Sequence, residues 1–353
     1  MDPGWSDPGW SGTSWQGPDR SDRRRGKRGR PEGEGSAGAP RARETRAPQL
    51  AKAEADASLQ RMSRAVVLGG GGPVGVGWES GLVVGLAAQG VELRLADLVL
   101  GTSAGSIVGA ELTLGWDLEA SLALLDSAWP QAEAEPAAPQ GIELLMAELA
   151  RAALGAPSPL ELRRNLGRIA LEAHTVSETY YLGLFAGVED QAWPAGFRCT
   201  AVDTATGEAV VWEATSGVPL NLAVASSCSV PGIFPPVTID GRRYMDGGMK
   251  TALNADLAAG HERVVAFSCF ALELPEGVSD PVAEMVNAAV DAELQAVRSS
   301  GSRLEVVAPG PEMLELSGWG LRLMDQGLAR EAFEVGKRQA AEEAERVAAT
   351  WGT

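Results

Sequence analysis

A five-residue motif, GTSAG at residues 101–105, carries the strongest chemical signal in this sequence. It follows a short apolar run and precedes a helical pattern, which is the context of a nucleophile elbow. The tight turn imposes strained backbone angles on its serine, so the neighbours must be small, as Gly101 and Gly105 are. The turn lifts the Ser103 hydroxyl toward substrate, and the following helix N-terminus stabilises negative charge. Ser103 is therefore a candidate nucleophile, although GxSxG alone is also compatible with an ordinary Gly/Ser loop.

A glycine run at residues 69–72 follows another apolar stretch. Glycines let several backbone N–H groups converge on one point, which suits a developing oxyanion. Gly70, Gly72 and Gly75 also fit the spacing GxGxxG, and Glu92 lies about twenty residues further on, so a dinucleotide-binding interpretation stays open. The proline after the run and a nearby tryptophan do not favour close approach of a pyrophosphate to the helix.

The third motif is Asp246-Gly247-Gly248, directly after the short strand predicted at residues 243–245. An acid followed by two glycines makes a tight turn that holds the carboxylate close to the chain where the strand stops. By itself, the Asp-Gly-Gly motif is also explained by an aspartate with a purely structural role in a turn. Three such motifs at three predicted strand ends indicate one reaction centre.

The elements that must position these motifs alternate between apolar runs and helical stretches from residue 64 onward. Two strand–Gly loop–helix units within fifty residues predict a parallel sheet with helices on its faces. The expected fold class is α/β: one three-layer α/β/α domain with a mainly parallel central sheet, over residues 61–353. Its expected strands are 65–68, 96–100, 197–202 with 209–212 as a hairpin, a pair about residues 240–241, 263–268 and 304–307; its expected helices include 78–89, a stretch through about 114, 219–225, 280–299 and 325–350.

A second feature is a helical insertion at residues 116–190, amphipathic throughout and without a strand pattern. Pro/Gly breaks divide it into the stretches 117–129, 142–154 and 160–173. An insertion of this kind caps an active site or packs as an outer layer; the sequence is compatible with both.

Residues 1–60 differ from the rest in composition. They open with the near-repeat DPGWSDPGWSG, continue into a basic stretch and lack helical or strand periodicity, so we expect a disordered tail. The whole chain has a formal net charge of −17, and since the tail is slightly basic, the negative charge lies in the remainder and argues against nucleic acid as a partner. Three well-separated cysteines and no paired metal-ligand spacing predict neither a disulfide framework nor a metal site, and fit a reducing cytoplasm. No apolar run is long enough for a spanning helix.

Together the three motifs resemble the patatin-like phospholipase family, which combines a Gly-rich loop, a GxSxG elbow and a later Asp-Gly-Gly. The corresponding residues here are 70–75, 101–105 and 246–248, and the stretch SSCSVPGIFPPV at 226–237 is similar to the one before the family's Asp motif. The resemblance spans about residues 64–260. It implies a Ser–Asp dyad in which Ser103 attacks the acyl carbonyl and Asp246 is the base. The implied oxyanion-hole donors are the backbone N–H groups of Gly70, Gly71, Gly72 and Ala104. The other glycines of the three motifs are Gly75, Gly101, Gly105, Gly247 and Gly248.

The resemblance further implies a lipid acyl hydrolase of the phospholipase A or carboxylesterase type. From the position and amphipathicity of the 116–190 insertion alone, we hypothesise that it supplies apolar surface for acyl chains. We expect a lipid or other acyl ester as the substrate, no organic cofactor, no metal and no calcium dependence. A cytoplasmic location is expected, and peripheral membrane contact is compatible with it; the oligomeric state stays open. One departure is Val74, where many members have Arg or Lys, so the head-group preference is also open.

Several alternatives remain at this point. Acyl transfer to an alcohol other than water would use the same dyad. A Ser–His–Asp triad would need one of only two histidines, and His261 follows Ser103 and Asp246 in chain order. The non-enzymatic alternatives are a nucleotide-binding α/β protein and a scaffold that binds through its tail. The intact Ser103, Asp246 and glycine loop argue against a pure scaffold.

Overall fold

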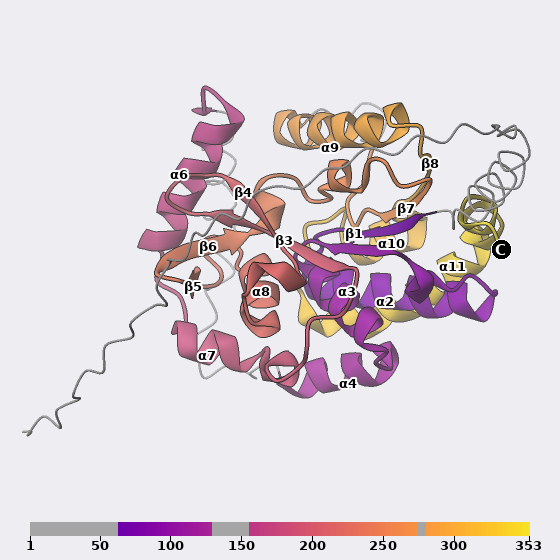
Figure 1. Ribbon diagram of the computed structural model, residues 1–353, viewed down its shortest axis with the longest axis horizontal. Coiled ribbons are helices and arrows are strands. Elements are labelled where there is room, and N and C mark those ends of the chain that lie inside the picture. The colour runs from indigo at the N-terminus through magenta and orange to yellow at the C-terminus, as the bar shows by residue number, and fades with distance from the viewer. Residues whose placement is uncertain (1–62, 129–154, 274–279) are drawn as a thin grey trace, which may run out of the picture. The chain divides into compact units, whose positions relative to one another are not determined.

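The mixed sheet at the centre of the chain is flanked by helices on both faces (Figure 1). The computed structural model describes residues 63–128, 155–273 and 280–353, which belong to a unit running from Arg61 to Thr353. The expected tail at 1–60 and the predicted helix at 142–154 lie outside these residues. The strands are β1 (Arg64–Leu68), β2 (Leu98–Gly101), β3 (Phe197–Asp203), β4 (Ala209–Trp212), β5 (Val237–Ile239), β6 (Arg242–Asp246), β7 (Arg263–Phe267) and β8 (Arg303–Val307).

The strand order is β5-β6-β3-β2-β1-β7-β8, with β4 paired to β3. β3, β2, β1, β7 and β8 run parallel, whereas β4, β5 and β6 form antiparallel pairs. The expected mainly parallel α/β/α fold is therefore confirmed, including the hairpin of β3 and β4. Because β1 and β2 are parallel neighbours, the glycine run and the GTSAG motif emerge at the same edge of the sheet.

Alternation along the buried strands builds two separate cores. In β1, Val66 and Leu68 face the larger core, while Ala65 and Val67 face the smaller one. Helices α2 and α11 pack on the larger core, and α9 covers the opposite face (Figure 1). The α-helices are α2 (Gly72–Ala88), α3 (Ala104–Leu114), α4 (Leu118–Ala128), α6 (Pro159–Glu172), α7 (Glu178–Gly183), α8 (Leu220–Ser227), α9 (Pro281–Ser299), α10 (Pro311–Leu316) and α11 (Ala329–Trp351). The 3-10 helices are η1 (Leu93–Leu95), η2 (Ala186–Val188), η3 (Ala214–Ser216), η4 (Gly247–Met249), η5 (Ala255–Ala258) and η6 (Gln326–Leu328).

Helices α2 and α10 differ most from the sequence-based expectation. Helix α2 begins at Gly72 rather than Trp78, because the proline that follows Gly72 is tolerated in the first helical turn. The glycine run therefore leads directly into a helix N-terminus. Helix α10 was not predicted, since its six residues are too few to display a periodicity.

The described part of the 116–190 insertion contains α4, α6, α7 and the 3-10 helix η2, and no strand. Helix α6 packs against β3 and β6 through a small third core. Within the described residues, no helix combines the length and apolar character needed to cross a bilayer.

Candidate active site

Ser103 occupies a strained turn between β2 and α3. It has φ 51° and ψ −117°, in the left-handed half of the backbone map that a side chain rarely adopts. The flanking glycines are required by crowding: a Cβ at Gly101 would lie 2.4 Å from the Gly105 carbonyl oxygen, and one at Gly105 would lie 2.2 Å from that of Leu68. Ser103 is 8% exposed. The local geometry is that of a nucleophile elbow.

Helix α8 and the residues after it hold the backbone of Ser103. The Ser103 N–H donates to the Ser227 hydroxyl at 3.0 Å, and its carbonyl accepts from the Ser106 hydroxyl at 2.7 Å and from the Cys228 thiol at 3.2 Å. Ser227 and Cys228 belong to the SSCSVPGIFPPV stretch. In the sequence, this stretch was notable only for its resemblance to the family. In the structure, its hydrogen bonds to Ser103 give it a role in supporting the elbow.

Asp246 ends β6, two strands from the elbow. Its Oδ1 accepts the Gly248 N–H at 2.7 Å, while its own N–H donates to the Ser229 carbonyl at 2.9 Å. Among the described residues Oδ2 has no partner in normal hydrogen-bond geometry. Burial raises the pKa of Asp246 to about 7, against the lowering effect of hydrogen bonding from the Ser103 side chain and from the Gly248 N–H. The structure thus brings the Ser103 side chain and the Asp246 carboxyl group next to each other.

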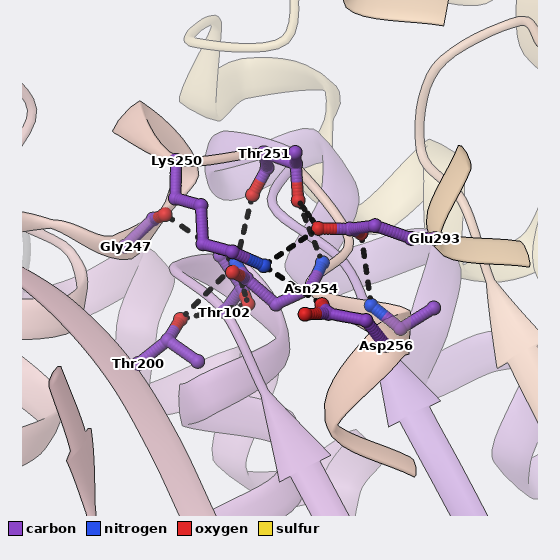
Figure 2. A network of polar contacts seen from close by, with 9 residues as sticks. Thr102, Thr200, Gly247, Lys250, Thr251, Asn254, Asp256 and Glu293 are labelled. Atoms are coloured by element: carbon purple, nitrogen blue, oxygen red, sulfur yellow. Dashed lines mark hydrogen bonds and ion pairs between the residues drawn. The ribbon is translucent and has the colours of Figure 1, made fainter. Parts of the chain in front are cut away.

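A polar network joins the segments that carry Ser103 and Asp246 (Figure 2). Asn254, held in a left-handed conformation with φ 56°, donates from Nδ2 to the Thr102 hydroxyl at 3.1 Å and lies 3.4 Å from the Gly247 carbonyl oxygen. Thr102 and Thr200 share a hydroxyl contact of 2.9 Å. Residues adjacent to the candidate nucleophile and base are thus tied to one side chain.

The outer part of the same network is ionic. The Lys250 ammonium donates to Asp256 and Glu293 at 2.7 Å each, and Glu293 also accepts from the Thr251 hydroxyl at 2.7 Å (Figure 2). This arrangement pins the turn that follows Asp246 to helix α9. The sequence analysis missed Asn254, Lys250 and Glu293, because no local pattern indicates contacts between segments so far apart.

The glycine loop offers fewer N–H donors than expected. The N–H of Gly70, expected as an oxyanion-hole donor, donates to the Ala252 carbonyl at 2.7 Å in this structure. Within the described residues no acceptor is seen for the N–H groups of Gly71, Gly72 and Ala104. Gly72 and Ala104 are the first residues of α2 and α3, where the helix itself leaves N–H groups unpaired.

The remaining motif glycines permit close packing around these donors. A Cβ at Gly247 would lie 2.1 Å from the Thr200 hydroxyl oxygen, and one at Gly248 would lie 2.9 Å from Asp246 Oδ1. A Cβ at Gly75 would lie 3.0 Å from the Cys269 sulfur. Each of these glycines keeps a neighbouring segment at the distance that the site needs.

Glu79 supports the glycine loop from inside the protein. It is fully buried on α2, and its Oε1 accepts the Gly69 N–H at 2.7 Å. Burial raises its pKa well above the ordinary range, against the lowering effect of hydrogen bonds from the Gly69 N–H and the Cys269 thiol. Burial thus favours the uncharged form of the Glu79 carboxyl group. The sequence analysis did not identify it, because a single Glu in a helical pattern is usually solvated.

An apolar cavity opens beside Ser103. Ser103, Gly72 and Ala104 lie in its wall together with side chains from the helical insertion, notably Leu122 and Tyr181. The insertion therefore contributes apolar surface next to Ser103. The other lining residues are Pro73, Val76, Ile107, Phe185, Cys228, Val230, Phe234, Met324, Gln326 and Ala329.

The topology argues against His261 as the base of a Ser–His–Asp triad. His261 precedes β7, and its Nδ1 lies 3.0 Å from the Ala258 carbonyl oxygen. Because β7 is parallel to β1, the start of β7 lies at the edge of the sheet opposite to the strand ends that carry the elbow. Among the described residues, no group of three or more His, Cys, Asp and Glu side chains is arranged to hold a metal ion.

The sheet and its strand-end motifs define an α/β protein with a serine at a nucleophile elbow. The family model for patatin-like phospholipase matches residues 66–259, more than half of the chain. The chain belongs to the patatin-like phospholipase family, whose activity is lipid acyl hydrolysis.

Solved structures with a similar arrangement are distant in sequence. VipD from Legionella pneumophila is 13% identical with a TM-score of 0.34, over 80% of this chain and 67% of VipD. The type III effector protein ExoU is 18% identical with a TM-score of 0.31, over 79% of this chain and 53% of ExoU. ExoU from Pseudomonas aeruginosa in complex with SpcU is 20% identical with a TM-score of 0.28, over 79% of this chain and 52% of that one. The chain thus spans about half the length of ExoU. No curated protein sequence matches it significantly.

Proposed function

We propose that this protein hydrolyses carboxylic ester bonds of lipids through an acyl intermediate on Ser103, with Asp246 as the general base. The observation that carries the proposal is the position of Ser103. Its strained turn lies in the wall of an apolar cavity, and its side chain interacts by hydrogen bonding with the buried Asp246 carboxyl group, whose pKa is about 7.

The acylation step uses these groups in order. The Asp246 carboxylate accepts the proton of the Ser103 hydroxyl while Oγ bonds to the acyl carbon. The carbonyl oxygen takes the negative charge, and the N–H groups of Gly71, Gly72 and Ala104 stabilise it. The C–O bond to the alcohol then breaks, and Asp246 returns the proton to the leaving oxygen.

Deacylation repeats the sequence with water. Asp246 takes a proton from water as its oxygen attacks the acyl carbon, and the second tetrahedral intermediate collapses to a fatty acid and free Ser103. Asp246 delivers the proton to the serine oxygen. A base that titrates near neutral pH serves both directions of proton transfer, because efficiency is greatest when the pKa lies close to the working pH.

The cavity favours an acyl chain as the group that is recognised. Its lining is almost entirely apolar and includes Leu122, Tyr181 and Phe185 of the insertion. Val74 is fully buried, so at this position the loop presents no charge to a head group. The acyl chain, rather than a charged head group, is therefore expected to dominate binding.

The test compares wild type with Ser103→Ala and Asp246→Asn, on p-nitrophenyl butyrate and on phosphatidylcholine vesicles. Ser299→Ala and Asp291→Asn are matched controls, since both residues are exposed on α9. We expect ester and lipid hydrolysis in wild type and both controls, and a loss of about 10²–10⁴-fold in Asp246→Asn. Full activity in a folded Ser103→Ala would refute the proposal.

A further inference from the structure

The loop between α10 and η6, residues 317–324, has an unusual backbone. Three consecutive residues, Gly318, Trp319 and Gly320, have φ of 57°, 58° and 93°. For a bulky aromatic residue this conformation is rare and strained. Backbone hydrogen bonds hold it, from the Trp319 N–H to the Leu314 carbonyl and from the Arg322 N–H to the Ser317 carbonyl, both at 2.8 Å. The loop is a built structure.

Its outer side exposes large apolar side chains. Leu321 is 91% exposed, the highest value for a large hydrophobic residue in the described part of the chain, and Trp319 is 56% exposed. Phe270, 38% exposed, is a neighbour, since a Cβ at Gly320 would lie 3.8 Å from its ring. Strain that presents a tryptophan to solvent gains nothing for the core, so it points to a binding role.

The inner side of the same loop belongs to the active site. The Leu323 carbonyl accepts the Val74 N–H at 3.2 Å, and Met324 lines the acyl cavity. At Gly72 a Cβ would lie 2.6 Å from the Leu323 carbonyl oxygen. One short loop therefore has an apolar outer tip and an inner face that touches the glycine loop and the cavity.

We propose that the 317–324 loop docks the enzyme on the surface of a lipid aggregate, with Trp319 and Leu321 inserted at the interface, so that acyl chains reach the cavity along the loop's inner face. This rests on the proposed function, because it assumes that the cavity takes acyl chains. A lipid surface fits better than a folded partner, since the loop that carries the exposed tip also lines, through Met324, the cavity proposed for a lipid tail. Indole rings favour the boundary between head groups and chains.

Charge specifies the kind of surface. The net charge of −17 disfavours approach to an anionic membrane, so the docking is hydrophobic and suits zwitterionic lipid. We expect binding to phosphatidylcholine vesicles that changes little with salt. A requirement for anionic lipid would contradict this assignment.

The test measures sedimentation with phosphatidylcholine vesicles, hydrolysis of the vesicle lipid, and turnover of soluble p-nitrophenyl butyrate. Leu321→Asp removes the most exposed apolar side chain, and Trp319→Gly removes the indole while relieving the backbone strain. Leu171→Asp on α6 is the matched control, because Leu171 is 48% exposed elsewhere on the chain. We expect vesicle binding and vesicle hydrolysis to fall about 10- to 100-fold for Leu321→Asp, the effect of withholding one leucine from an apolar phase. Turnover of the soluble ester stays at the wild-type level.

Three outcomes would overturn the proposal. Unchanged vesicle binding in Leu321→Asp removes the role of the loop, and an equal loss in Leu171→Asp makes the effect non-specific. A wild-type dimer that dissociates on Leu321→Asp, seen by analytical ultracentrifugation, assigns the tip to self-association instead. Failure of the proposed function is seen separately, as absent turnover of the soluble ester while vesicle binding persists.

Discussion

Replacing Asp246 by Asn should make the protein more stable, and the gain should grow with pH. In the folded state the pKa of Asp246 is about 7, whereas an aspartate in an unfolded chain titrates near 3.9. Between these values the unfolded state releases a proton that the folded state keeps, so the wild type loses stability as pH rises through this window. Asparagine has no proton to lose and resembles the protonated form.

The magnitude follows from the same two values. The pKa of Asp246 is about 3.9 in the unfolded chain and about 7 in the folded state. This difference lowers the stability of the wild type by about 4 kcal/mol at pH 8.5 and by about 1.5 kcal/mol at pH 5. The stability difference between Asp246→Asn and wild type should therefore widen by about 3 kcal/mol between these two pH values.

Urea unfolding at pH 5, 6, 7 and 8.5 measures this difference, with Asp291→Asn as the exposed control. Other buried carboxyl groups titrate as well, notably Glu111, whose pKa is raised to about 8 by burial despite a hydrogen bond from Ser121. Subtracting wild type from variant cancels them. A difference that stays constant with pH would refute the assignment of a raised pKa to Asp246.

Further predictions concern the elbow, the glycine loop and the cavity. Ser103→Gly should abolish turnover and raise the free energy of unfolding by about 1–3 kcal/mol, because glycine relieves the strained φ of 51°; thermal denaturation against Ser103→Ala checks it. Glu79→Gln should stay within about 1 kcal/mol of wild type, because the amide oxygen still accepts the Gly69 N–H and burial disfavours the charged form of Glu79, whereas Glu79→Leu should lose about 1–3 kcal/mol with that hydrogen bond; urea unfolding separates the two. Ile107→Trp should fill the cavity and shift kcat/KM about tenfold from decanoate toward butyrate esters, measured on the p-nitrophenyl series.

The sequence predicted well the elements that border glycine motifs. Strands β1 and β2 are short apolar runs that end in glycine motifs, and both the sheet neighbourhood and the strand-end position of Ser103 follow from that pattern. The start of α2 could not be predicted in the same way. A glycine run followed by proline usually indicates a loop, but proline is well accommodated in the first turn of a helix, as in α2.

Contacts between distant segments explain what the sequence left out. Whether the N–H of Gly70 is available depends on the carbonyl of Ala252, which no local pattern places beside it. Asn254 was missed for the same reason, since its partner Thr102 lies far away in the chain. Tertiary packing, rather than residue type, decides which backbone donors and which buried polar groups belong to the site.

The most direct test of the central claim is covalent labelling by a fluorophosphonate serine-hydrolase probe, followed by intact mass and peptide mapping. For the wild type we predict one probe per chain, attached to Ser103, with a labelling rate that rises with pH around an apparent pKa of about 7. Ser103→Ala should not label, and Asp246→Asn should label far more slowly while remaining folded. A probe found on another residue, or no label on a folded wild type that still hydrolyses esters, would contradict the account.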